Sequence, residues 1–339
     1  GIKMESAALS GVNVVRNPMF ADYFKTWYET YKFPSIRKST QKRYITNYHY
    51  IENYFGDTKI KNIARSNYQK FLNYLGKKHA PATVRKTNIM IKSCIGNAVE
   101  DGLVERNFTN RTTIAGNKNA EKHVQYLNMK ELCKLVQLCL TDLNTRYTSK
   151  YLVLAGIFTG ARIGELSALK WSDIDFKNNT ININKSWNCN TKKLGPTKTK
   201  SSVRKIKVNS FLLKTIKQLK VNNLDFVFAI PRTELPPSSS AVNQFLRRTL
   251  DQGNIYKQDF HFHSLRHTHV AYLLSKGVDI SAISKRLGHA NIATTLKIYA
   301  YLLDEYKEKQ DSKIINSLDD ICATFVQHGQ NYSSSLELH

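Results

Sequence analysis

Apolar residues recur at helical spacing through the first third of the chain. Phe20, Phe24 and Trp27 lie three or four residues apart, which predicts an amphipathic helix that begins near Met19. The same spacing and the cap-forming residues predict three further helices, over 39–55, 67–75 and 82–99. We therefore expect a small helical domain at 18–113, preceded by an aperiodic tether at 1–17.

The hydrophobic period changes after a polar, aperiodic stretch at 114–122, which we expect to be a linker. Asn128, with Glu131 three residues later, has the spacing of a capping box and opens the first helix of a second domain. Residues 180–184 and 204–208 alternate between apolar and polar, which predicts strands. The predicted fold class is mainly α with a small antiparallel β-sheet (α+β).

Three helical segments are predicted between 264 and 303, the first beginning near Ser264. Gly277 and Gly288 end the first two segments by supplying left-handed caps, and Ser281 opens the second. Asn291 is expected to cap the third segment, which runs to 303. We expect the second domain to cover 123–303 and the tail, 304–339, to offer a contact to another subunit.

Proton-carrying and phosphate-binding side chains gather in these segments. His263 and Arg266, three residues apart, share one helix face, while His289 falls in a turn and Tyr299 on the last helix. Taken singly, each residue has an ordinary structural explanation, such as a hydrogen-bonded histidine or a core tyrosine. Together they can point two histidines, an arginine and a tyrosine at one place.

Residues 151–169 are apolar except for Arg162 and Glu165, which we expect on one helical face. Burying an unpaired guanidinium is costly, so Arg162 should lie at the edge of the core, oriented by Glu165 and facing an anion. A purely structural ion pair explains the bare pattern equally well.

The chain carries 51 Lys and Arg against 26 Asp and Glu, a formal charge of +25. Such an excess repels itself unless a polyanion binds it, which favours nucleic acid as the partner. A basic but otherwise ordinary enzyme is the alternative. No apolar run reaches the roughly 18 residues that would indicate a membrane helix.

Basic and hydroxyl side chains cluster at the starts of two predicted helices, where backbone N–H groups also favour phosphate. Solvated helix faces are the simpler explanation for any single lysine. We predict DNA contact for seven of these residues: Lys38, Thr40, Lys42, Arg43, Thr83, Arg85 and Lys86.

The five cysteines are widely spaced and include no Cys-x-x-Cys pair, which argues against both a disulfide framework and a zinc site. We expect reduced thiols, an intracellular protein, and neither a metal nor a cofactor.

Four motifs carry a resemblance to the tyrosine recombinase (phage integrase) family over residues 19–303. They are Thr159 to Leu166 (TGARIGEL), His263 to Thr268 (HSLRHT), Leu287-Gly288-His289 and Thr294 to Tyr299 (TTLKIY). The resemblance implies a helical core-binding domain followed by a catalytic domain. It also implies six catalytic residues, with Glu165 in support: Arg162, Lys198, His263, Arg266, His289 and Tyr299.

In the family these positions have defined roles, which the resemblance carries over to this chain. Tyr299 would be the nucleophile, the two arginines would bind the phosphate, and His289 would donate a further hydrogen bond to it. His263 would be the general base or a hydrogen-bond partner, and Lys198, in the predicted hairpin, the general acid. Lys200 is an alternative to Lys198. Tyr301 would point about 200° away from Tyr299 on the same helix.

The resemblance implies a site-specific recombinase of a mobile element that joins DNA through a 3′-phosphotyrosine intermediate. Its partners would be double-stranded attachment sites, three further subunits on synapsed DNA, and accessory DNA-bending or directionality proteins, in the nucleoid of a bacterial cell. A further N-terminal DNA-binding module would be missing from this chain. The alternatives are a type IB topoisomerase-like enzyme and a DNA-binding regulator with a decayed site.

Overall fold

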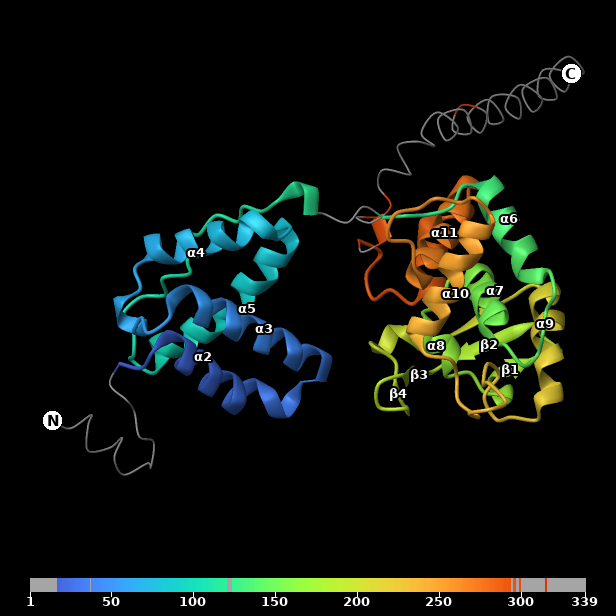
Figure 1. Cartoon of the computed structure of the whole chain (residues 1–339), viewed down its shortest axis with the longest axis horizontal. Coiled ribbons are helices and arrows are strands. Elements are labelled where there is room, and N and C mark those ends of the chain that lie inside the picture. The colour runs from blue at the N-terminus through green and yellow to red at the C-terminus, as the bar shows by residue number, and fades with distance from the viewer. Residues whose placement is uncertain are drawn as a thin grey trace, which may run out of the picture. The chain divides into compact units, whose positions relative to one another are not determined.

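A computed structural model of the protein describes residues 17–36, 38–120, 124–293, 295–296, 299 and 315 (Figure 1). The chain forms two compact units, residues 1–123 and 124–339. The expected tether at 1–16, most of the third segment beyond 293, and nearly all of the tail at 304–339 lie outside the described residues.

The first unit is helical, as its apolar spacing predicted. Its elements surround a core to which every long helix contributes, with Phe24, Ile51, Phe71 and Ile91 all fully or almost fully buried. The elements are α2 (Phe20–Trp27), η1 (Tyr28–Lys32), η2 (Phe33–Ser35), α3 (Lys38–Phe55), η3 (Ile60–Asn62), α4 (Arg65–Lys78), α5 (Pro81–Glu100) and η4 (Lys118–Ala120).

Part of the expected linker packs on this unit. Asn117 of this stretch donates from its backbone N–H to the carbonyl of His79, which follows α4, at 2.9 Å. A Cβ on Gly116 would lie 2.4 Å from the backbone nitrogen of Pro81, so only glycine fits this close approach. The segment therefore belongs to the packing of the helical unit as far as Asn117.

The second unit is built around α7 (Ser149–Thr159), which has no polar face. Tyr151 to Ala155 are all fully buried, as expected for a helix surrounded by other elements. Gly156 lets α11 approach, because a Cβ there would meet the ring of Phe262 at 2.6 Å. The other helices are α6 (Met129–Leu140), α8 (Ile163–Ser167), α9 (Ser210–Lys217), α10 (Ser239–Gln252), α11 (Phe262–Ser275) and α12 (Ile280–Leu287), with the short turns η5 (Trp171–Asp173), η6 (Lys200–Ser202) and η7 (Gln218–Asn222).

The two predicted strands pair as expected, and a second hairpin separates them. β2 (Thr180–Ile183) lies between β1 (Ile174–Asp175) and β5 (Arg204–Lys207) in an antiparallel sheet, with Ile181 opposite Ile206. β3 (Lys185–Asn188) pairs with β4 (Lys193–Pro196). Gly195 and Pro196 lie inside β4.

Three helix boundaries differ from those expected. Residues 151–169 form two helices, because Gly160 adopts a left-handed conformation (φ 64°) and ends α7. Arg162 then precedes α8 as its N-cap residue. The cap of α12 is Asp279, whose Oδ1 accepts from the backbone of Ser281 and Ala282, so this helix begins one residue earlier than predicted. α11 begins at Phe262, two residues before Ser264.

Candidate active site

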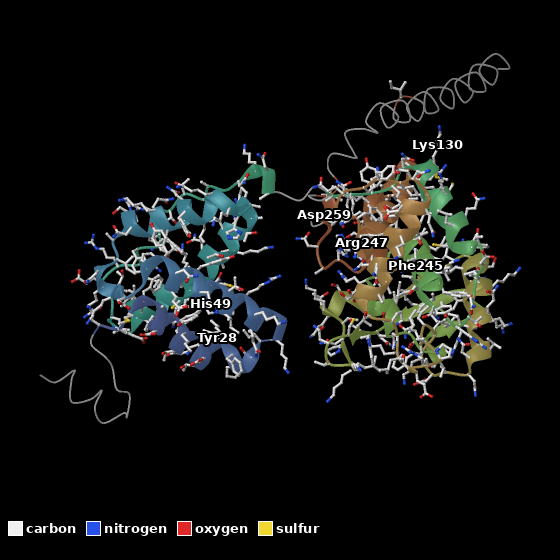
Figure 2. All side chains as sticks on the ribbon, in the orientation of Figure 1. Tyr28, His49, Lys130, Phe245, Arg247 and Asp259 are labelled. Carbon is white, nitrogen blue, oxygen red and sulfur yellow. The ribbon has the colours of Figure 1, made fainter. Side chains whose placement is uncertain are left out.

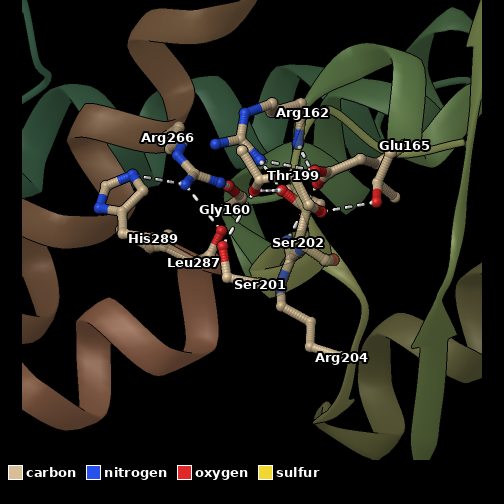
Figure 3. Close-up of polar contacts among 12 residues, drawn as sticks. Gly160, Arg162, Glu165, Thr199, Ser201, Ser202, Arg204, Arg266, Leu287 and His289 are labelled. Carbon is tan, nitrogen blue, oxygen red and sulfur yellow. Dashed lines mark hydrogen bonds and ion pairs between the residues drawn. The ribbon is translucent and has the colours of Figure 1, made fainter. Parts of the chain in front are cut away.

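Arg162 and Glu165 lie where the chain leaves α7 and begins α8 (Figure 3). Nη1 of Arg162 donates to Oε1 of Glu165 at 2.7 Å, and the backbone N–H of Arg162 donates to Oε2 at 3.0 Å. Arg204 of β5 donates from Nη2 to the same Oε2, also at 3.0 Å. Burial would raise the pKa of Glu165, but Arg204 and Arg162 outweigh it and hold that pKa below its ordinary value. The ionised carboxylate therefore orients two guanidinium groups.

Arg266 brings a third guanidinium from α11 and is only 3% exposed. Its Nη1 donates to the carbonyl of Gly160 at 2.9 Å, and its Nη2 donates to the carbonyl of Leu287 at 2.8 Å. Gly160 therefore has two roles. Its carbonyl is a hydrogen-bond acceptor for Arg266, and its left-handed turn puts Arg162 at the start of α8. Burial and the nearby Arg162 lower the pKa of Arg266 to about 9, so it keeps its charge at neutral pH.

The cluster carries more positive than negative charge. Among the described residues it holds Arg162, Arg204 and Arg266 against the single carboxylate of Glu165. The side chain of Arg162 is 27% exposed, whereas that of Arg204 is 7% exposed, so Arg162 is the more accessible of this pair. Partly buried guanidinium groups in excess favour an anion, and their paired N–H groups match the oxygens of a phosphate.

His289 follows the left-handed Gly288 and lies beside Arg266, as the sequence predicted. Its Nε2 is 2.8 Å from Nη2 of Arg266 and its Nδ1 is 2.7 Å from Oγ1 of Thr295. Since a guanidinium can only donate, Nε2 is the acceptor and the ring proton lies on Nδ1. Burial and then Arg266, Arg162 and Arg204 lower the pKa of His289 to about 4, which leaves the ring neutral at pH 7.

Tyr299 is 1% exposed and packs among apolar residues of α11 and α12, including Val270 and Leu287. Its hydroxyl lies 2.6 Å from Nδ1 of His267. The ring of His263 packs edge-on against the ring of His267, with centroids 5.0 Å apart. His263 and Tyr299 thus both contact His267, a residue to which the sequence motifs gave no role.

Lys198 and Lys200 follow β4 and are both exposed. Between them, Thr199 shares hydrogen bonds of 2.9 Å with the hydroxyls of Ser201 and Ser202. Ser202 in turn lies 3.4 Å from Nη1 of Arg162, so the lysine-bearing loop is attached to the arginine cluster (Figure 3). Lys198 and Lys200 both flank Thr199, so either lysine is a candidate for the general acid.

A second network supports the cluster from behind. His269 binds the carbonyl of Ile157 through Nδ1 at 2.8 Å and accepts from Nε of Arg286 through Nε2 at 3.1 Å. Arg286 donates to the carbonyls of Lys207 and Phe158, while its own carbonyl accepts from Nε of Arg204 at 2.6 Å. These bonds join the end of α7 to β5, α11 and α12.

The sequence did not identify Arg204, His267 or His269. Arg204 lies 39 residues from Glu165 in the sequence. The alternating pattern of its strand does not distinguish an arginine that binds a buried carboxylate from one that faces solvent. His267 had one available signal, since it follows His263 by four residues and therefore lies above it on the same helix.

The residues predicted to contact DNA lie at the starts of α3 and α5. Lys38, Lys42, Arg43, Thr83, Arg85 and Lys86 are exposed, and Thr40 is half-buried. Asn47 of α3 accepts a hydrogen bond from Thr87 of α5 at 3.0 Å, so the two helices are neighbours. Figure 2 shows many nitrogen-bearing side chains projecting from the surface of both units.

Within the described residues, no three His, Cys, Asp or Glu side chains are grouped so that they could hold a metal ion. None of the described helices combines the length and apolar character that crossing a membrane requires.

Both units of the chain match models of known protein families. Residues 125–305 match the model of the phage integrase family, and residues 19–76 match that of the phage integrase N-terminal SAM-like domain. The integrase of Staphylococcus phage L54a is 31% identical over 218 residues, which cover 58% of this chain. That match spans 61% of the phage protein, which is less than two thirds of its length.

Solved structures share the fold. The Tn1549 transposon integrase, in complex with a circular intermediate DNA, superposes with a TM-score of 0.73 at 17% identity, covering 83% of this chain and 95% of that one. A lambda integrase tetramer bound to a Holliday junction gives a TM-score of 0.62 at 19% identity, covering 83% of this chain and 80% of that one.

Proposed function

Because the chain belongs to the phage integrase family, we propose that it is a site-specific DNA recombinase of a mobile element. It cuts and rejoins the strands of double-stranded attachment sites through a covalent 3′-phosphotyrosine intermediate. The observation that carries this proposal is the excess of guanidinium groups around Glu165, in the same unit as the buried hydroxyl of Tyr299.

The cleavage step assigns one event to each group. The hydroxyl of Tyr299 gives its proton to a neighbouring histidine, and its oxygen forms a bond to phosphorus while the bond from phosphorus to the 5′-oxygen breaks. Arg162 and Arg266 bind the nonbridging oxygens, and positive charge placed in advance lowers the barrier by several kcal/mol. Lys198 donates a proton to the departing 5′-oxygen. Because the phosphotyrosine conserves the bond energy, another 5′-hydroxyl can reverse the step without ATP.

His289 acts as a further hydrogen-bond donor only after its protons rearrange. Its Nε2 accepts from Nη2 of Arg266, so in this hydrogen-bond arrangement Nε2 has no proton to give to a phosphate. A bound phosphate would engage Arg266 and place negative charge next to the ring, which favours a proton on Nε2. DNA binding itself therefore prepares this donor.

The test of the function is recombination between two attachment-site duplexes from the element that encodes the protein. We expect recombinant junctions whose formation depends on both sites. Relaxation of any supercoiled plasmid without recombinants would indicate the topoisomerase-like alternative. DNA binding without strand exchange or covalent complexes would indicate the regulator with a decayed site.

The helical unit, 18–113, binds the DNA backbone through the starts of α3 and α5. In the full chain, replacing Arg43 and Arg85 with Ala should flatten the dependence of log affinity on log salt by up to about two units, since each neutralised phosphate contributes about −0.9. Filter binding or fluorescence anisotropy across a salt series measures this slope.

The matched control replaces Lys61 and Lys70, exposed basic residues of the same unit outside the two clusters. If the control flattens the slope as much as the Arg43 and Arg85 pair does, binding is diffuse and our assignment of the DNA-binding face is wrong.

The working assembly is a homotetramer on two paired DNA sites. An apolar groove in the second unit is lined by residues that include Leu132, Val136, Phe158, Leu273 and Ile283. It suits the apolar positions of the tail, 304–339, donated by a neighbouring subunit. Accessory DNA-bending or directionality proteins set the direction of the reaction, and the protein acts in the bacterial nucleoid.

A further inference from the structure

The contact between His267 and Tyr299 is the feature that the assigned roles leave unused. Nδ1 of His267 lies 2.6 Å from the hydroxyl oxygen of Tyr299, and the two ring centroids are 5.6 Å apart. A separation this short is typical of a strong hydrogen bond to a hydroxyl group. His267 is also the residue next to Arg266, so the partner of the phenol and a phosphate-binding guanidinium occupy the same turn of α11.

The charges around His267 allow this hydrogen bond to run from the phenol to the imidazole. Burial, followed by Arg266, His261 and His289, lowers the pKa of His267 to about 4, so its ring is neutral at pH 7. A neutral imidazole carries one proton, and with that proton on Nε2 the Nδ1 atom is an acceptor. The hydroxyl of Tyr299 can then donate its proton to the lone pair of Nδ1 of His267.

His263, the base or hydrogen-bond partner that the family resemblance implied, lies against the ring of His267. Its ring packs edge-on against His267 at 5.0 Å and lies 6.4 Å from the ring of His261. His263 is exposed, whereas His267 is half-buried and in hydrogen-bond contact with Tyr299. His263 is therefore better placed to meet DNA, and His267 to meet the phenol.

Arg266 favours one half of the state that follows proton transfer, the Tyr299 phenolate, although burial and the same guanidinium disfavour the His267 imidazolium. Arg266 is close enough for its charge to interact with a Tyr299 phenolate. Moving a proton from Tyr299 to His267 creates a phenolate that this guanidinium stabilises. When phosphate arrives, its negative charge stabilises the imidazolium in turn.

We infer that His267 is the general base for the nucleophile, an inference that rests on the proposed function. As the oxygen of Tyr299 bonds to phosphorus, its proton moves to Nδ1 of His267, and the 5′-oxygen leaves with a proton from Lys198. Religation runs in reverse, with the His267 imidazolium returning its proton to the Tyr299 oxygen. His263 binds the substrate phosphate and holds the ring of His267 in place.

The test compares two phenols in three proteins. Tyrosine or a fluorinated, more acidic tyrosine is inserted at position 299 by suppression of a stop codon, in the wild-type background and with His267→Ala or His263→Ala. The rate of covalent-complex formation on a nicked duplex is measured at saturating protein. With tyrosine, His267→Ala should lose about 10²- to 10⁴-fold, the usual contribution of a general base. With the acidic phenol, already ionised, the loss should shrink to less than about 10-fold.

His263→Ala should keep its defect with both phenols, because it acts on the phosphate. If the acidic phenol restores the cleavage rate of His263→Ala, whether or not it also restores that of His267→Ala, the inference is wrong. It is also wrong if the acidic phenol restores the rate of neither variant. Faster cleavage by His267→Ala would also overturn it, by showing that His267 restrains the phenol. DNA affinity and circular dichroism of each variant confirm that it folds, and His267→Asn provides a second variant that retains an acceptor near Nδ1. If the wild-type protein forms no complex, the proposed function fails before this comparison begins.

Discussion

Replacing Tyr299 with Phe should abolish covalent protein–DNA complexes and leave DNA affinity within about a factor of two. Only a hydroxyl is lost, so the ring still packs against Val270 and Leu287, and the cost to folding is that of one hydrogen bond, about 1–3 kcal/mol. The chemistry loses its nucleophile entirely. Denaturing gels of protein incubated with end-labelled nicked duplex measure the complex, and anisotropy measures binding.

Tyr301→Phe is the matched control, because it removes a phenol two residues along the same chain segment and should leave the complex intact. A complex that survives in Tyr299→Phe and disappears in Tyr301→Phe would reassign the nucleophile.

The second large effect separates the proton donor from the phosphate ligands. Lys198→Ala should slow cleavage of ordinary DNA by about 10²-fold or more, the usual contribution of a general acid. The same variant should cleave DNA with sulfur in place of the leaving 5′-oxygen at nearly the wild-type rate, because a thiolate leaves without a proton. Arg162→Ala should be impaired on both substrates, since it removes stabilisation of the phosphate itself.

Lys200→Ala is the control for this experiment, as both lysines are exposed on the same loop. If sulfur rescues Lys200→Ala and leaves Lys198→Ala impaired, the general acid is two residues further along the chain.

The helices and strands with a regular hydrophobic period could be predicted. The points at which one element ends and the next begins were predicted less accurately. A hydrophobic period follows from the burial of one face of an element. The structure buries the predicted faces, at Phe20, Phe24 and Trp27 in α2 and at Ile181 and Ile183 in β2. The split between α7 and α8 was missed because both helices are apolar, so no change in pattern marks Gly160. The β3–β4 hairpin was missed because a strand exposed on most positions carries no alternation.

The site could be predicted wherever its residues lie in short motifs. Arg266 lies in a helix and His289 directly follows the glycine turn at Gly288, and both features are local in the sequence. The structure brings these two side chains together. Arg204 reaches Glu165 from a different element, and the position of His267 against Tyr299 depends on how the last helical segment packs on α11. Such pairings are set by tertiary packing, which no local spacing encodes.

The most direct test of the central claim is the polarity and metal dependence of the covalent complex. A nicked attachment-site duplex is labelled on either side of the cut, incubated with the protein in EDTA, and digested with protease for mass spectrometry. The account predicts that the strand ending in the 3′-phosphate stays with the protein, in EDTA, attached to the peptide containing Tyr299. Attachment through a 5′-phosphate, linkage to a serine, or a strict need for a divalent metal would contradict it.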